Sequence, residues 1–177
     1  MADEWVQLPR PGGLEGGLGE VLWRRRSSYR YGARKLRLVE VADLLGNAVG
    51  VSRRVAAYGR DDHGLGLAPS AGGLPSVGVY VVPLLVAELP AGVFDYDRDG
   101  HRLVLRVPAV SRADMAAALV QPEFAELAAA LVVLTIRTGP GVAKYGLRHV
   151  RTMAVIIRPG TARRRECSTR SGITTVG

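Results

Sequence analysis

Residues 76–107 read SVGVYVVPLLVAELPAGVFDYDRDGHRLVLRV, and this stretch determines the fold class of the chain. Its first part, Val77–Glu88, is apolar and rich in β-branched residues, a composition typical of a buried strand. Val93–Asp97 and Arg102–Val107 are two further strand candidates, joined by Arg98–Gly100, whose Asp-Gly pair favours a tight turn. The stretch therefore predicts a buried strand followed by a β-hairpin.

Helical patterns lie on both sides of these strands. Within Val39–Ala48 an apolar residue recurs at the i, i+3, i+4 and i+7 spacing of one helix face, and the four positions are Val41, Leu44, Leu45 and Ala48. Ser111 and Asp114 form a variant of the capping box, which predicts that a helix over 113–120 begins there. Further helices are expected near Glu20–Trp23, over Pro122–Leu127 and over Lys144–Ile157.

The remaining elements complete an α+β domain with an antiparallel or mixed sheet. Leu131–Arg137 is predicted to be a second buried strand, and Thr138–Gly141 a turn before the last helix. Val51–Gly73 is rich in Gly, Asp, Ser and Arg and lacks periodicity, so it is predicted to be a long functional loop. Pro9–Gly19, with its prolines and glycines, is predicted to be a loop or mobile arm.

Length and composition indicate a single globular domain in the cytoplasm. The chain has 177 residues, of which 47% are hydrophobic, and its one cysteine, Cys167, cannot form an intramolecular disulfide. No Cys/His cluster has the spacing of a zinc site, so no metal is expected. Met1–Gly19 lacks the apolar stretch of a signal peptide, and the longest apolar runs are too short or interrupted for a membrane span.

The charge of +8 is concentrated in two arginine clusters. One is Arg24–Arg26, and the other begins at Arg158 near the C-terminus. Neither is interleaved with aromatic residues, and no helix-turn-helix or zinc-finger pattern is present, so nucleic acid is not an expected partner.

Two segments have compositions suited to a ligand. Arg24–Gly32 reads RRRSSYRYG, and its guanidinium and hydroxyl groups can bind a phosphate, although a solvated basic turn has the same composition. Ala68–Tyr80 reads APSAGGLPSVGVY, and its small residues let backbone amides approach a planar ligand, although a flexible turn is the alternative.

Taken together, these segments resemble the nitroreductase superfamily, and in particular its SagB-type (McbC-like) peptide azoline dehydrogenases. Arg25–Gly32 is similar to the R-R-S-x-R-x-Y/F signature of nitroreductase-like flavoproteins, and Pro69–Pro75 to the P-S-x-G segment of the SagB-type branch. Gly92–Asp97 resembles the G-x-Y-x-Y-D hairpin of that branch, and Lys144-Tyr145 its lysine-tyrosine pair. The resemblance covers roughly Leu22–Arg151.

The resemblance implies a nitroreductase-like fold and an FMN cofactor. It implies that Arg25, Arg26 and Ser27 contact the FMN phosphate and ribityl chain, and that Ser70, Ala71 and Gly72 lie beside the isoalloxazine ring. Lys144 and Tyr145 would be catalytic, because oxidation of an azoline requires removal of a proton from carbon, and either a lysine with a lowered pKa or a polarised tyrosine can accept it. Otherwise these two residues are an exposed cation and a half-buried ring.

The resemblance ends after Arg151, where the chain becomes rich in Arg, Ser, Thr and Gly. The expected division is therefore a flexible arm over 1–19, a partial nitroreductase-like domain over 20–157 and a basic tail over 158–177, with the C-terminal end truncated or altered. Loss of the following helix, a core and dimer element in the family, is expected to expose apolar side chains on Val77–Leu89 and Leu131–Ile136.

Three functions are compatible with these patterns. The first is an FMN-dependent dehydrogenase that oxidises azolines in a ribosomally made peptide, as a homodimer or within a heteromeric synthetase complex. The second is a degenerate, flavin-free homologue that serves as a partner or peptide-binding subunit. The third is a reductase of small nitro compounds or quinones. The Lys144-Tyr145 pair and the Ser70–Gly73 loop favour the first.

Overall fold

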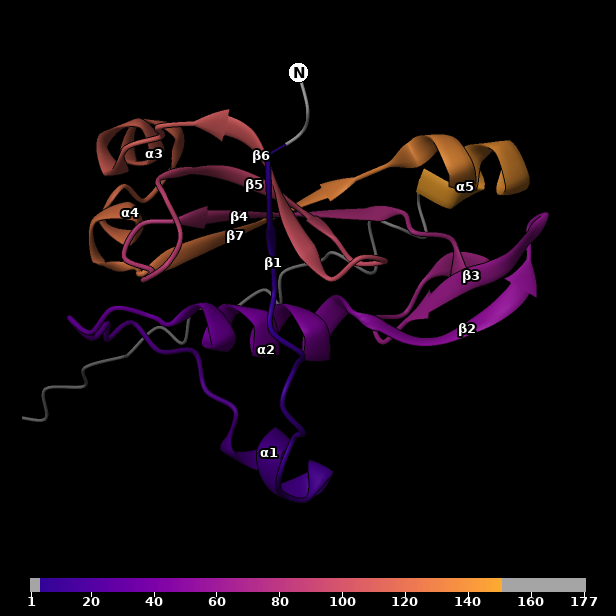
Figure 1. Cartoon of the computed structure of the whole chain (residues 1–177), viewed down its shortest axis with the longest axis horizontal. Coiled ribbons are helices and arrows are strands. Elements are labelled where there is room, and N and C mark those ends of the chain that lie inside the picture. The colour runs from indigo at the N-terminus through magenta and orange to yellow at the C-terminus, as the bar shows by residue number, and fades with distance from the viewer. Residues whose placement is uncertain (1–3, 151–177) are drawn as a thin grey trace, which may run out of the picture.

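The computed structural model describes residues 4–150, which contain an antiparallel sheet of five strands with a long helix packed on it (Figure 1). The strand order is β1-β6-β5-β4-β7. Every pair of neighbours in this sheet is antiparallel, which confirms the predicted α+β class. The strands are β1 (Trp5–Gln7), β4 (Val77–Pro83), β5 (Gly92–Asp97), β6 (Arg102–Pro108) and β7 (Ala130–Ile136).

The β5–β6 hairpin is confirmed, and side chains fix its turn. The Asp97 carboxylate accepts the backbone N–H groups of Asp99 and Gly100 at 3.1 and 3.3 Å. The Tyr96 hydroxyl lies 2.8 Å from Nδ1 of His101, and Nε2 of the same ring lies 2.8 Å from the Pro9 carbonyl oxygen. A carbonyl can only accept, so Nε2 carries a proton, and in the neutral imidazole Tyr96 donates to Nδ1. Burial is the main reason that the pKa of Tyr96 is raised to about 12.

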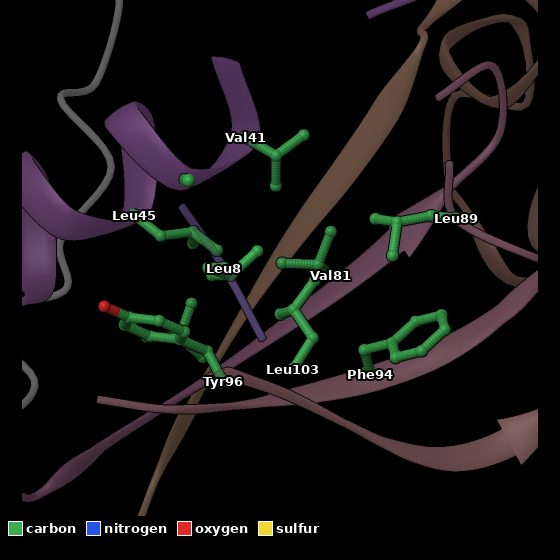
Figure 2. Close-up of a cluster of buried hydrophobic side chains, with 10 residues drawn as sticks. Leu8, Val41, Leu45, Val81, Leu89, Phe94, Tyr96 and Leu103 are labelled. Atoms are coloured by element: carbon green, nitrogen blue, oxygen red, sulfur yellow. The ribbon is translucent and has the colours of Figure 1, made fainter. Parts of the chain in front are cut away.

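The core lies between α2 (Leu38–Val49) and the sheet (Figure 2). The helix confirms the prediction over Val39–Ala48, but its buried face is rotated from the predicted one, because Leu44 and Ala48 are exposed while Ala42 is buried. Below the helix, Phe94, Val81 and Leu103 are each at most 1% exposed. The cluster consists of Leu8, Val41, Ala42, Leu45, Val79, Val81, Leu89, Phe94, Tyr96 and Leu103.

The N-terminal segment contributes a strand that the sequence did not predict. β1 pairs with β6, and the next residue, Leu8, is only 3% exposed. Pro11 then packs against Gly46 of α2. A Cβ atom built on Gly46 would lie only 2.1 Å from Cγ of Pro11. The backbone N–H of Gly12 donates to Asp43 at 2.7 Å, so part of the segment predicted to be a mobile arm is fixed to α2. The predicted division into arm, domain and tail otherwise stays a prediction, and residues 158–177 lie outside the described residues.

The prediction of a long loop over Val51–Gly73 is wrong for most of its length. β2 (Val51–Ala57) and β3 (Arg60–Gly66) form a separate antiparallel hairpin. Tyr58 and Gly59 connect them with φ angles of 54° and 71°, as expected for a two-residue turn with two left-handed positions. Only the last part of the segment is a loop, and it contains the single 3₁₀ turn η1 (Ala71–Gly73).

The C-terminal half follows the predicted order, with shifted boundaries. Ser111 and Asp114 form the predicted capping box at α3 (Arg112–Ala118), which is followed by α4 (Glu123–Leu127). The predicted turn over Thr138–Gly141 is wrong, because α5 (Thr138–Tyr145) already begins there. Residues 148–150 are helical again, and the remainder of the helix predicted over Lys144–Ile157 lies outside the described residues.

β7 is an edge strand with exposed apolar side chains, so its prediction as a buried strand is wrong. Val132 and Leu134 pair with the core residues Val81 and Val79 and therefore point to the same face of the sheet, yet they are 45% and 49% exposed. The expected exposure of apolar side chains is thus found on β7. On β4 it is not, because Val79, Val81 and Val82 are at most 6% exposed.

Candidate functional site

Three side chains from distant parts of the chain converge on Gly72. Gly72 has a φ of 61°, and a Cβ atom built on it would lie 2.1 Å from the hydroxyl of Tyr145, 3.1 Å from that of Tyr58 and 3.2 Å from Nζ of Lys144. Both the backbone conformation and the available space therefore require glycine. The structure thus places the predicted pair Lys144 and Tyr145 directly against the predicted loop residue Gly72.

Lys144 is held as a cation at this point. Its Nζ donates to the Tyr58 hydroxyl at 2.6 Å and lies 4.4 Å from the centroid of the Tyr58 ring and 5.1 Å from that of Tyr145. The hydrogen bond to Tyr58, followed by the one to Tyr145, raises the pKa of Lys144 above its ordinary value. The raised pKa differs from the expectation of a lysine base with a lowered pKa, and the catalytic roles of Lys144 and Tyr145 stay predictions.

Sequence reasoning missed Tyr58 and two histidines at this site. The Tyr58 hydroxyl donates to the Gly72 carbonyl, and its ring lies edge-on to His63, with centroids 5.0 Å apart. His63 is 6% exposed, and its Nε2 lies 3.0 Å from the Gly73 carbonyl oxygen. The one available signal was the Tyr58-Gly59 dipeptide, a composition compatible with a hairpin turn.

His149 is the second missed histidine. Its ring stacks on Tyr145 with centroids 6.1 Å apart and planes at 17°. It is 1% exposed, and within residues 4–150 neither ring nitrogen has a hydrogen-bond partner. The ring packs on the backbone of α5, because a Cβ atom at Gly141 would lie 1.9 Å from Nε2.

Two cavities lie against neighbouring residues of the loop over Pro69–Ala71. One, of about 350 Å³, lies against Pro69 and Ser70 and has apolar walls from Leu74, Val77 and Val79. The other, of about 440 Å³, is lined by Ala71, Tyr145, Arg148 and His149. Both volumes lie in the range of small-molecule sites.

The polar wall of the 350 Å³ cavity is formed by ion pairs on β5 and β6. Asp95 lies 3.2 Å from a guanidinium nitrogen of Arg106 and 3.3 Å from one of Arg137. Arg102 donates to Asp97 at 2.8 Å. Burial by itself would raise the pKa of Asp97, but the hydrogen bonds from the Gly100 N–H and Arg102 outweigh it and the pKa is lowered. The wall therefore presents fixed charges of both signs.

The predicted phosphate-binding residues lie elsewhere. Arg25, Arg26 and Ser27 are exposed and follow α1 (Leu18–Arg24), a helix that confirms the prediction near Glu20–Trp23. Two residues later, Tyr29 stacks on Phe124 of α4, with ring centroids 6.3 Å apart. α4 and α5 are at opposite ends of the sheet (Figure 1), so one chain brings Lys144 and Tyr145 to the Ser70–Gly72 loop but leaves Arg25–Ser27 apart from them.

Among residues 4–150 no group of three or more His, Cys, Asp or Glu side chains is arranged to hold a metal ion. In the same residues no helix has the length and apolar character needed to cross a membrane.

Comparison with solved structures identifies proteins of similar fold. A protein described as a nitroreductase from Ralstonia eutropha JMP134 matches with a TM-score of 0.60 and 22% identity over 86% of this chain and 65% of that chain. A second protein described as a nitroreductase, from Anabaena variabilis ATCC 29413, matches with a TM-score of 0.58 and 18% identity, over 81% of this chain and 29% of that chain. The E. coli microcin synthetase McbBCD complex with truncated pro-MccB17 bound matches with a TM-score of 0.54 and 19% identity, over 84% of this chain and 57% of that chain. No protein-family model and no curated protein matches the chain.

These matches show a nitroreductase-like fold, as the sequence predicted. The chain spans less than two thirds of each of these structures, 65%, 29% and 57% of their lengths.

Proposed function

We propose that this chain is the dehydrogenase component, or part of it, of an FMN-dependent enzyme that oxidises azoline rings to azoles in a peptide. The observation that carries the proposal is the packing of Lys144 and Tyr145 on Gly72. In the sequence these residues belong to two separate segments that resemble the SagB-type branch. Their meeting in space is what a shared active site requires, and one of the solved structures of similar fold is a synthetase complex with a peptide bound.

The chain contains groups that fit FMN. Arg25, Arg26 and Ser27 offer exposed guanidinium and hydroxyl donors, the chemistry that binds a phosphate. Ser70 lines a cavity of about 350 Å³ with an apolar floor and a charged wall, which suits a ring system with one polar edge. When bound, FMN would accept a hydride from the substrate.

The residues around Gly72 would handle the proton. Oxidation of an azoline removes a hydride and a proton from the ring. Lys144 carries a proton at neutral pH, since its ordinary pKa is 10.5 and the hydrogen bonds to Tyr58 and Tyr145 raise it further. An adjacent ammonium stabilises a phenolate, so we assign to Tyr145, as its phenolate, the acceptance of the ring proton, and to Lys144 the stabilisation of that phenolate.

A complete site would require a second chain. Arg25–Ser27 and Lys144 lie at separate places in one chain, so a homodimer that combines Arg25–Ser27 of one copy with the Ser70–Gly72 loop of the other would assemble all the predicted contacts. A partner within a heteromeric synthetase complex could supply the same groups.

Titration with FMN tests the proposal. The purified chain, alone or with its synthetase partners, is expected to bind FMN and to convert an azoline peptide to the azole. Arg26→Ala should weaken FMN binding by about tenfold, the loss of one charge-assisted contact. Arg60→Ala, which removes an exposed arginine of the β2–β3 hairpin, is the matched control. A colourless protein that takes up no FMN in either setting would reject the proposal.

Two other functions remain as outcomes of this experiment. The synthetase complex among the solved structures of similar fold favours a flavin-free partner subunit, which would co-purify with a synthetase component and leave azole formation unaffected by Lys144→Ala. The neighbours described as nitroreductases favour a small-molecule reductase, which would consume NAD(P)H in the presence of nitro compounds or quinones.

A further inference from the structure

The tip of the β2–β3 hairpin is attached to the site at Gly72. Tyr58, the first residue of the turn, has a φ of 54°, an uncommon conformation for a tyrosine. Its side chain reaches residues from two other segments, the loop at Gly72 and α5 at Lys144. A strained turn whose side chain bridges two segments is a costly arrangement, which makes this contact a candidate for a specific role.

Tyr58 contacts Lys144 in two ways. Its hydroxyl accepts a hydrogen bond from Nζ at 2.6 Å, and its ring face lies 4.4 Å from the same nitrogen. The Tyr58 hydroxyl in turn donates a hydrogen bond to the Gly72 carbonyl, so its oxygen acts as acceptor and donor at once. One oxygen atom thereby joins the ammonium to the loop.

His63 supports the same arrangement from β3. Its ring lies edge-on to Tyr58, and its Nε2 lies 3.0 Å from the Gly73 carbonyl oxygen. The hairpin therefore contacts the carbonyl oxygens of two consecutive loop residues, Gly72 through Tyr58 and Gly73 through His63. Two contacts on adjacent peptide groups fix the orientation of the loop as well as its position.

We propose that Tyr58 is a positioning residue, which holds the Lys144 ammonium and the Gly72 loop in one fixed arrangement, so that the β2–β3 hairpin is part of the active site. The inference rests on the proposed function. Tyr58 acts through Lys144 and takes no part in the chemical step. Loss of its hydroxyl is expected to lower kcat, because small displacements of a catalytic group are costly, and to leave FMN binding unchanged.

The two lysines of the chain, Lys35 and Lys144, allow a direct test without activity. NMR of the full chain with labelled lysine side chains follows the titration of both ammonium groups, with Lys35 as internal control. Tyr58→Phe keeps the ring and removes the hydroxyl, so the Lys144 pKa is expected to fall relative to wild type, because this hydrogen bond is the largest cause of its rise. Tyr145, Arg148 and His149 on the C-terminal side and His63 on β3 are other titratable or charged groups nearby.

Tyr31→Phe is the matched control, since Tyr31 contacts Phe124 through its ring, with centroids 6.3 Å apart, and the substitution keeps the ring. In Tyr58→Phe kcat for azole formation should fall about ten- to a hundredfold with KM little changed, and in Tyr31→Phe the Lys144 titration should not change. Circular dichroism verifies that both variants are folded, and Tyr58→Trp, which also lacks the hydroxyl, replaces Tyr58→Phe should that variant not fold.

An unchanged Lys144 titration or an unchanged kcat in the Tyr58 variant overturns the inference. Failure of the proposed function has a different signature. In that case wild-type protein lacks FMN binding and azole formation, while the NMR titration still reports whether Tyr58 holds Lys144.

Discussion

Gly72 is the residue at which the site should tolerate least change. Gly72→Ala would place a methyl group at a φ of 61° and 2.1 Å from the Tyr145 hydroxyl, so the loop or the tyrosine has to move. We expect the backbone strain to lower the free energy of unfolding by about 1–3 kcal/mol. The rate of azole formation should fall by a larger fraction than the stability does. Denaturant unfolding and steady-state assays measure the two effects.

Gly139→Ala is the control for this substitution, because a Cβ atom there meets no atom within 4 Å and the residue lies in the first turn of α5. Its stability should be unchanged or slightly raised. Equal losses in the two variants would show that Gly72 has no special role.

The sequence predicted only those site residues that belong to local motifs. Lys144, Tyr145 and the Ser70–Gly72 loop were singled out, and the structure brings Gly72 and the pair together, while their roles stay predictions. Tyr58 was missed because its contact with Lys144 joins residues 86 positions apart and depends on a hairpin that has no apolar pattern. Such a contact follows from tertiary structure alone.

At the scale of elements, the Glu40 carboxylate holds the start of α2. Glu40 accepts hydrogen bonds from Arg34 at 2.8 Å and from the backbone N–H of Arg37 at 2.8 Å. The Arg34 bond, followed by the Arg37 N–H, lowers the pKa of Glu40 from 4.5 to about 2. A lowered pKa in the folded state means that this contribution to stability is present above pH 4.5 and is lost as the pH falls toward about 2.

Glu40→Gln should therefore lower the Tm at pH 7, and its difference from wild type should disappear as the pH falls from 4.5 to about 2. The difference should also shrink at high salt, because the group is exposed. Thermal unfolding at several pH values measures it. Glu20→Gln, which removes an exposed pair with Arg24 on α1, should have little effect, and an equal effect of both substitutions would contradict this account.

Elements with a clear apolar period were predicted, and those formed by tertiary contacts were not. The β5–β6 hairpin and α2 carry their own patterns, and both were found. The first turn of α5 contains Gly139, Pro140 and Gly141, which by propensity favour a turn. Proline is tolerated in a first helical turn, and Gly141 accommodates the His149 ring, so packing outweighs propensity there.

At the scale of the whole molecule, the sheet ends in an uncovered apolar edge. Leu134 on β7 is 49% exposed on the face that forms the core further along the sheet. Exposed apolar edge strands favour association, and a charge on such a strand opposes it. Leu134→Lys is expected to shift the chain toward monomer in sedimentation velocity experiments at micromolar concentration.

Val120→Lys supplies the comparison, because Val120 is fully exposed just after α3 and lies away from the sheet. It should leave the association state unchanged. If Leu134→Lys also leaves it unchanged, β7 is not the associating surface.

The pairing of β1 with β6 also affects how the chain acquires its structure. The Pro9 carbonyl and the His101 ring that bonds to it are 92 residues apart, and within residues 4–150 β1 has no strand other than β6 beside it. Closing so long a segment costs conformational entropy before any contact offsets it. During synthesis β1 therefore stays unpaired until β6 has been made, and we expect folding to begin at the β5–β6 hairpin, whose contacts are local.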